Sequence, residues 1–416
     1  MLFGRKKKSN VSQFKIDNQP VTDTKTNYEK RVERLKKEKR RIRNRKIIIR
    51  LIIIIILIVI GIVIYYNADK LTNPGNFLGG GSSRSSFDQK ITGNSVEAMM
   101  EYRGNLSVLS NTSFTVYNTK GDILENRVHG IVNPAMNVSG EYVIIYNRGG
   151  RDLKIESGQT SMFSKIIDQH IINADVDKKG NFLIVTAGEG KNLSEIKFYD
   201  KAGKEQNKYE QSKYYITSVQ YSPDGKNAVA VLVNSKDGAI SSAIAIFDID
   251  KNEPKIIPVE EDFLLKAKFS GTKIIAISDT ALYSFTYDGE MTEKFDFTGY
   301  QLCAFNIYEN SQCIVGLKKN TDKKDNKILL FDSDLNKLAD VNSEEEMREV
   351  YVSENRIIGL SNTGLKIFNL QGEITEEHKT GEDAIKFTVI NDSAYVVGLE
   401  ELKKYDIKSK KIIIEK

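Results

Sequence analysis

Three features of the 416-residue sequence predict an all-β fold: a β-propeller of about eight four-stranded blades (alternatively seven), preceded by one N-terminal transmembrane α-helix. The features are an uninterrupted apolar run, an aromatic–Asp/Asn pair that recurs about every 41 residues, and a tight turn in the same register. A chain of this length exceeds what one compact core usually supports, so repeats are expected. With 28% charged and 40% hydrophobic residues, the composition excludes a wholly disordered or polytopic membrane protein.

Residues 1–46 form a basic segment, with 17 Lys/Arg against 5 Asp/Glu, whereas the remainder of the chain has a net charge of −7. We expect a cytoplasmic tail that is partly disordered, is helical near the membrane and contacts anionic lipid. The alternative is that these charges only fix the topology and solvate the helix. No base-reading motif accompanies them, so nucleic acid is not an expected partner.

Residues 47–66 form the apolar run that predicts the transmembrane helix. Twenty helical residues span about 30 Å, the thickness of the hydrocarbon core of a bilayer. The only charge is Arg50, near one end, and Tyr65 and Tyr66 lie where an aromatic belt is expected. A buried β-strand is the alternative, but strands rarely run so long without a polar residue. The run ends in Tyr-Tyr-Asn and is too long for a cleavable signal peptide, so we expect an uncleaved anchor.

The flanks of this helix predict its orientation. Eleven Lys/Arg lie in Lys30–Lys46, whereas residues 67–86 contain only two, Lys70 and Arg84. The positive-inside rule then places the N-terminus in the cytoplasm and residues 67–416, which include the predicted propeller 87–416, outside the cell membrane. Residues 67–86 include the stretch GGGSSRSS and are expected to form a flexible linker.

The region after the linker repeats a short alternating strand that ends in an aromatic residue followed by Asp or Asn. A degenerate copy ends in Ile155-Glu156. We expect each aromatic side chain to pack between adjacent blades and each Asp or Asn to accept backbone N–H bonds in the following turn. The clear pairs are Tyr117-Asn118, Tyr199-Asp200, Phe247-Asp248, Tyr287-Asp288, Phe331-Asp332, Phe368-Asn369 and Tyr405-Asp406.

A tight turn recurs about 13–22 residues before each of these strand ends, flanked in most copies by alternating hydrophobic residues. Gly, Asn and Asp at such turns supply the positive φ that short hairpins require. Each repeat therefore predicts four antiparallel strands, a to d, with this turn between a and b. The turns are Arg103-Gly104, Ser139-Gly140, Lys179-Gly180, Asp224-Gly225, Ser270-Gly271, Asn310-Ser311, Glu354-Asn355 and Asp392-Ser393.

The segment Tyr221–Leu232 reads YSPDGKNAVAVL, which resembles the S-P-D-G-K repeat of TolB-type and WD40-like propellers. A basic tail, one span, a Gly/Ser linker and a propeller of TolB-like, WD40-like or PQQ-like repeats together resemble an uncharacterised family of membrane-anchored propellers from low-GC Gram-positive bacteria. The resemblance implies an architecture and no activity. The ring is expected to close through Lys411–Glu415 pairing within its own blade, or through Phe87–Ile91 pairing with the final blade.

The sequence assigns no catalytic, cofactor-binding or metal-ligating residue, so we expect no enzyme and no cofactor. It contains no G-x-S-x-G, H-E-x-x-H or P-loop motif, and without Trp it cannot form the blade-docking motif of quinoprotein dehydrogenases. His129, His170 and His378 are expected in exposed connections from strand d to the next strand a. A metal site that unites the first two is the less favoured alternative. Cys303 and Cys313 are expected to be buried free thiols, because their register keeps them about 10 Å apart.

A complete repeat without catalytic residues favours a non-enzymatic protein-interaction scaffold in a cell-envelope, division or secretion assembly, with envelope or membrane proteins as partners. One alternative is a ligand-binding or sensory propeller for a glycan, peptide or wall fragment, and a less favoured one is a hydrolase or lyase that uses channel carboxylates. Three long b–c connections are expected on the same face as the histidines, where they would shape a binding surface: Gly188–Ser194, Asn234–Ser242 and Lys318–Asn326.

Overall fold

The computed structural model describes residues 87–91, 95–236, 238–251, 253–259, 262–319 and 324–407. They belong to one compact unit, Ser83–Lys416. The predicted tail 1–46, helix 47–66 and linker 67–86 lie outside the described residues. No helix within the described ranges is long and apolar enough to cross a membrane.

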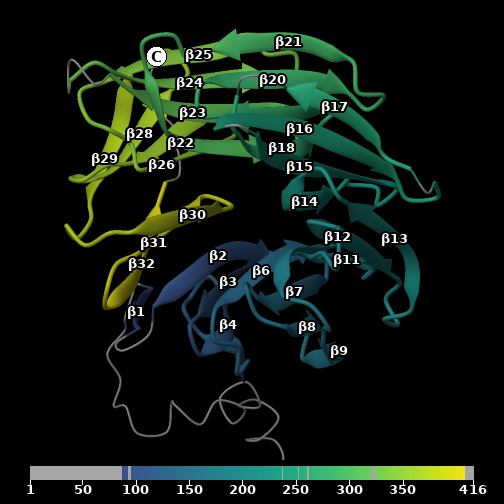
Figure 1. Ribbon diagram of the computed structural model, residues 1–416. Helices are drawn as coiled ribbons and strands as arrows, with labels where there is room; N and C mark the ends of the chain where they lie inside the picture. Colours follow the sequence, from purple (N-terminus) through teal and green to yellow (C-terminus); the bar gives the residue numbers. More distant parts are fainter. Residues whose placement is uncertain are drawn as a thin grey trace, which may run out of the picture. The chain divides into compact units, whose positions relative to one another are not determined.

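Within those ranges the chain forms thirty-two strands in eight four-stranded antiparallel sheets, which are the predicted blades (Figure 1). Blades 1 to 4 contain β2 (Val96–Tyr102), β3 (Asn105–Ser110), β4 (Ser113–Tyr117) and β5 (Ile123–Val128); β6 (Pro134–Ser139), β7 (Tyr142–Asn147), β8 (Asp152–Ser157) and β9 (Thr160–Ile166); β10 (Ile171–Val176), β11 (Phe182–Ala187), β12 (Ser194–Tyr199) and β13 (Glu205–Gln211); and β14 (Tyr215–Tyr221), β15 (Asn227–Lys236), β16 (Ala239–Asp248) and β17 (Lys255–Val259).

Blades 5 to 8 continue the pattern. They contain β18 (Leu264–Ser270), β19 (Lys273–Ser278), β20 (Ala281–Thr286) and β21 (Met291–Asp296); β22 (Gln301–Tyr308), β23 (Gln312–Lys318), β24 (Asn326–Asp332) and β25 (Lys337–Ser343); β26 (Glu349–Ser353), β27 (Arg356–Leu360), β28 (Gly364–Asn369) and β29 (Ile374–Lys379); and β30 (Lys386–Ile390), β31 (Ser393–Val397), β32 (Glu401–Asp406) and β1 (Asp88–Lys90).

The ring closes with a strand from the beginning of the described chain. β1 pairs antiparallel with β32, with Gln89 opposite Leu402, and supplies the outer strand of blade 8. The a strands, from β2 to β30, contact one another in ring order, and β30 returns to β2. These contacts confirm eight blades and closure through Phe87–Ile91. The alternative closing strand, Lys411–Glu415, lies outside the described residues.

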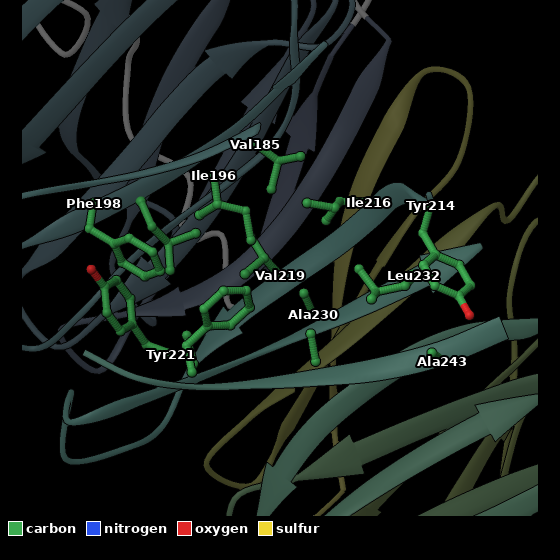
Figure 2. Close-up of a cluster of buried hydrophobic side chains, with 14 residues drawn as sticks. Val185, Ile196, Phe198, Tyr214, Ile216, Val219, Tyr221, Ala230, Leu232 and Ala243 are labelled. Carbon is green, nitrogen blue, oxygen red and sulfur yellow. The ribbon is translucent and has the colours of Figure 1, made fainter. Parts of the chain in front are cut away.

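The hydrophobic core consists of the walls between adjacent blades. Alternate residues of one strand serve two walls: Ala230 and Leu232 of β15 pack toward blade 3, whereas Val229 and Val231 pack toward blade 5. Figure 2 shows the first of these walls, where Ile196 and Phe198 of blade 3 face Val219 and Tyr221 of blade 4. The aromatic residue at the end of strand c packs in this wall, as predicted, because the ring centroid of Phe247 lies 5.7 Å from that of Phe198.

The turn chemistry is also as predicted. Each a–b turn contains a residue with positive φ, which is Ser311, Glu354 or Asn391 in the last three blades. After strand c, the Oδ1 atom of Asp200 accepts hydrogen bonds from the backbone N–H groups of Ala202 and Lys204, both at 3.0 Å. Equivalent bonds fix the turns that follow Asn118, Asp332 and Asn369.

In two blades, the residues at the aromatic and Asx positions of strand c differ from those predicted. In blade 5, Phe285 lies opposite Ile274 and is fully buried, and the hydroxyl of Thr286 accepts the turn N–H of Glu290. The functional pair is therefore Phe285-Thr286, and the prediction of Tyr287-Asp288 was wrong by two residues. In blade 2, β7 pairs Val143 with Glu156, so Glu156, predicted at the Asx position, lies one place earlier, at the aromatic position.

Candidate interaction face and central channel

The strand order gives the ring two unlike faces. Successive connections of an antiparallel sheet lie at alternate ends, so all a–b and c–d turns share one face and all b–c and d–a connections share the other. We call these the turn face and the loop face. The turn face is formed by short turns of defined hydrogen bonding, whereas the loop face carries connections of variable length.

Large apolar side chains are exposed on the loop face. Val132, in the connection from β5 to β6, is 89% exposed, and Val128 at the end of β5 is 79% exposed. The other exposed large apolar residues of the described ranges lie on outer d strands and are at most 55% exposed, so the most exposed ones gather on the loop face, which indicates an interaction surface. The full set at strand ends and connections of this face is Val128, Val132, Ile166, Tyr215, Ile240, Phe263, Leu265, Ile385 and Leu399.

A hairpin of blade 4 projects from the loop face. The segment Asn234–Ser242 was predicted as a long connection, but β15 and β16 continue their pairing to Lys236 and Ala239. The three extra residue pairs extend this blade by about 10 Å. The half-exposed Ile240 lies near the tip. The connection between β11 and β12 is a true loop, Gly188–Leu193, and only parts of Lys318–Asn326 lie within the described residues.

The three histidines lie in three different environments of the described structure. His129, predicted to be exposed, is buried: its Nε2–H donates to the carbonyl of Ser110 at 2.9 Å, and its Nδ1 accepts the N–H of Ile131 at 3.0 Å. Two backbone contacts thus hold the ring on both sides. His170 is exposed in a d–a connection as predicted, whereas His378 lies on β29 and not in a connection. The described residues contain no group of His, Cys, Asp or Glu with metal-binding geometry.

Both cysteines are free thiols, as predicted, but only Cys313 is buried; Cys303, also predicted to be buried, is partly exposed. A β-bulge at Cys303 lets its Sγ donate to the carbonyl of Gly316 at 3.0 Å, while Cys313 is buried in the wall between blades 5 and 6. Burial raises the pKa of Cys303 to about 11 and that of Cys313 to about 12. Neither thiol is therefore activated as a nucleophile.

The a strands surround a central channel with two cavities of about 530 and 270 Å³. The larger is lined by residues of every blade, and both share Met100, Asn137, Gln220 and Lys266. At the turn face, Lys178 Nζ lies 3.6 Å from Glu309 Oε2. These residues belong to blades 3 and 6, which are not neighbours, so the ion pair crosses the end of the channel.

Several polar side chains of the channel connect neighbouring blades. Asp175 Oδ2 accepts the backbone N–H of Tyr221 at 2.8 Å, and Glu349 Oε2 accepts that of Phe387 at 2.7 Å. Asn137 Nδ2 donates to the carbonyl of Ala174 at 2.7 Å. Burial raises the pKa of Asp175 to about 7 and raises that of Glu349. These groups therefore have a structural function, although a carboxyl with a pKa near 7 is also suited to proton transfer.

Two lysines of the channel lack such a partner. Lys266 and Lys268 lie on the same side of β18 and form no hydrogen bond or ion pair with any described residue. Lys266 is exposed to solvent and Lys268 is half-buried, but atoms of the surrounding blades displace part of the water around both ammonium groups. This desolvation lowers the pKa of both lysines, and the charge of Lys268 lowers that of Lys266 further. Nothing in the sequence marks these two among its many lysines.

The comparisons with known proteins agree with this fold. A family model described as "Family of unknown function (DUF5711)" matches residues 82–407. The structure of BamB from Moraxella catarrhalis is similar with a TM-score of 0.52 and 14% identity, over 77% of this chain and 98% of that one. A eukaryotic initiation factor is similar with a TM-score of 0.54 and 13% identity, over 76% and 86%. At these identities the likeness shows the fold alone. No curated protein matches the sequence significantly.

Proposed function

The chain belongs to the family of unknown function DUF5711, and from its structure we propose that it is a non-enzymatic protein-interaction scaffold whose loop face binds a partner protein. The observation that carries this proposal is the set of large exposed apolar side chains on that face, led by Val128 and Val132. The rigid ring holds them in fixed positions, which lowers the entropy lost on binding. The projecting hairpin of blade 4 adds a ridge that a partner groove can receive.

The proposal extends to the location of the protein. The apolar run of residues 47–66 and the basic residues before it support a single span with the N-terminus in the cytoplasm and the propeller outside the cell membrane. The partner would then be an envelope or membrane protein of an envelope, division or secretion assembly. The basic tail would contact anionic lipid.

Site-specific photo-crosslinking tests the loop face. A photoreactive residue at Val132 or Ile240 is expected to give discrete adducts with a partner protein in intact host cells. The matched controls are Lys120 and Lys201, exposed residues of c–d turns on the opposite face. Adducts of equal yield from both faces, or none from the loop face, would contradict the proposed surface.

Protease treatment of intact cells tests the location separately. A folded propeller resists proteases unless the protease is in large excess or the protein is partly unfolded. A specific protease site is therefore inserted after Lys120, and the protease is added to the outside of intact cells. Cleavage there in intact cells supports an outside propeller. Protection until the cells are lysed would show that the propeller faces the cytoplasm.

A further inference from the structure

We propose that the central channel binds a small hydroxylated organic anion, whose negative group lies between the ammonium groups of Lys266 and Lys268. The residues of the larger cavity provide the geometry, and its volume of about 530 Å³ lies in the range of small-molecule sites. This inference is independent of the partner proposed for the loop face.

The first argument is the unpaired charge. Lys266 and Lys268 are two residues apart on one strand face, so their Cα atoms lie about 7 Å apart along it. Surrounding protein atoms and the repulsion between the two ammonium groups lower the pKa of Lys266, although its side chain remains exposed to solvent. An anion between them would relieve both penalties, and a charge-assisted hydrogen bond is about twice as strong as a neutral one.

The second argument is that the acids of the channel do not neutralise these lysines by contact. Asp175 and Glu349 each accept a backbone N–H of the next blade, and Glu101 is the third carboxylate of the larger cavity. No ion pair joins any of the three to Lys266 or Lys268 in the described part of the chain. The space in front of the lysines remains available to a ligand.

The third argument is a set of buried polar atoms without partners on the same cavity. Arg348 donates through Nη1 to the carbonyl of Ala384 at 2.8 Å, but its buried Nε–H has no partner among the described residues. The buried Oε1 of Gln220 also lacks one. A buried polar atom without a partner is uncommon and marks a place for a ligand or an ordered water.

These atoms define the ligand chemistry. The lysines and Arg348 Nε require a phosphate or carboxylate, and Gln220 Oε1 accepts from a hydroxyl. Met99, Phe305 and Tyr351 line the same cavity and provide apolar contact for the carbon skeleton. A sugar phosphate and a hydroxycarboxylate both satisfy this description, whereas a purely apolar molecule does not.

The test is calorimetric titration of the full-length chain, kept in a mild detergent, with glucose 6-phosphate and with citrate at constant ionic strength. Saturable binding of either anion is expected, and the stronger of the two identifies the phosphate or the carboxylate. Joint replacement Lys266→Gln and Lys268→Gln should weaken that binding about tenfold or more. The control pair Lys201→Gln and Lys204→Gln, in an exposed c–d turn, should leave it unchanged.

Charge-retaining replacements separate binding from folding. The pair Lys266→Arg and Lys268→Arg should bind within a few-fold of the parent, and circular dichroism should show intact strands in every variant. Binding by the Gln pair as tight as that of the parent overturns the proposal. So does the absence of saturable binding of either anion up to millimolar concentration.

Discussion

The walls between the blades and the central channel are formed by the same strands, yet they differ in what their side chains contact. On β10, Ala174 and Val176 pack in the wall between blades 2 and 3, whereas Asn173 and Asp175 face the channel side. The wall is dry and apolar, so its contacts are numerous and interchangeable. In the channel, Asp175, Glu349 and Asn137 connect neighbouring blades, whereas Lys266 and Lys268 have no contact partner among the described residues. The comparison assigns stability mainly to the walls, while the proposed binding of an anion depends on the channel.

Truncation of a wall aromatic residue should have the largest effect. Phe247 is 4% exposed and packs against Phe198 and Tyr209 across the boundary of blades 3 and 4. Phe247→Ala is expected to lower the free energy of unfolding by about 3–5 kcal/mol, because the cavity cannot close between two sheets. Urea unfolding measures this change. Val128→Ala, at a 79% exposed position of the loop face, is the control and should change it by less than about 0.5 kcal/mol.

The free energy of unfolding should depend on pH through Asp175 of the channel. The pKa of Asp175 is raised from 3.8 to about 7, so the folded state binds a proton that the unfolded state has released. The stability associated with this proton is complete below pH 3.8 and is lost as the pH rises through about 7. Asp175→Asn keeps an oxygen for the N–H of Tyr221 and removes the titration. The parent should therefore lose about 2 kcal/mol relative to the variant between pH 5 and pH 7.

Urea unfolding of parent and Asp175→Asn at both pH values gives this difference directly. The charges of Lys266 and Lys268 lower the pKa of Asp175 and so oppose the effect of burial. Because salt screens these charges, both pH values are measured at the same ionic strength. A difference between the two proteins that is the same at pH 5 and pH 7 would show that Asp175 does not titrate in this range.

One wall departs from the aromatic pattern and sharpens the comparison. At the aromatic position of blade 2, Glu156 is buried and pairs with Arg127 of β5, whose side chain is 23% exposed. Arg127→Leu leaves a buried carboxylate without its partner and is expected to cost about 1–2 kcal/mol. Adding Glu156→Phe restores the apolar wall, so the double variant should be at least as stable as the parent. Thermal unfolding of the two variants distinguishes these outcomes, and a double variant weaker than Arg127→Leu would contradict them.

The fold could be predicted from the sequence because its determinants are local. The Asp or Asn residue and the turn N–H groups whose hydrogen bonds it accepts lie within four positions of each other, as at Asp200. Each repeat can therefore be recognised from its own short stretch of sequence. The register of blade 5 could not be read in this way. Tyr287-Asp288 has the same residue types as an aromatic–Asx pair. Only the pairing of Phe285 with the neighbouring strand shows that Phe285 is the residue in the wall between the blades.

The channel could not be predicted, for a different physical reason. The larger cavity combines one to four residues from each of the eight blades, and which residues face inward depends on strand parity. A β-bulge between Leu264 and Lys266 changes that parity in β18, and similar bulges occur in β10 and β14. Without the pairing, Lys266 and Lys268 read as ordinary surface lysines. The burial of His129 also depends on the fold, because its partners are Ser110 at the end of β3 and Ile131 in the connection from β5 to β6.

The smallest effect on stability is expected where the largest effect on binding is proposed. Val132 is 89% exposed, so Val132→Ser removes almost no buried surface and should change the free energy of unfolding by less than about 0.5 kcal/mol. If the loop face binds a partner, the same substitution removes apolar contact from that interface. Co-purification of the crosslinked partner should then fall several-fold, while Met291→Ser, at a 55% exposed position on the outer strand of blade 5, should leave it unchanged. Both substitutions remove exposed apolar area and differ mainly in where that area lies. Equal capture of the partner by the two variants would therefore contradict an interaction surface on the loop face.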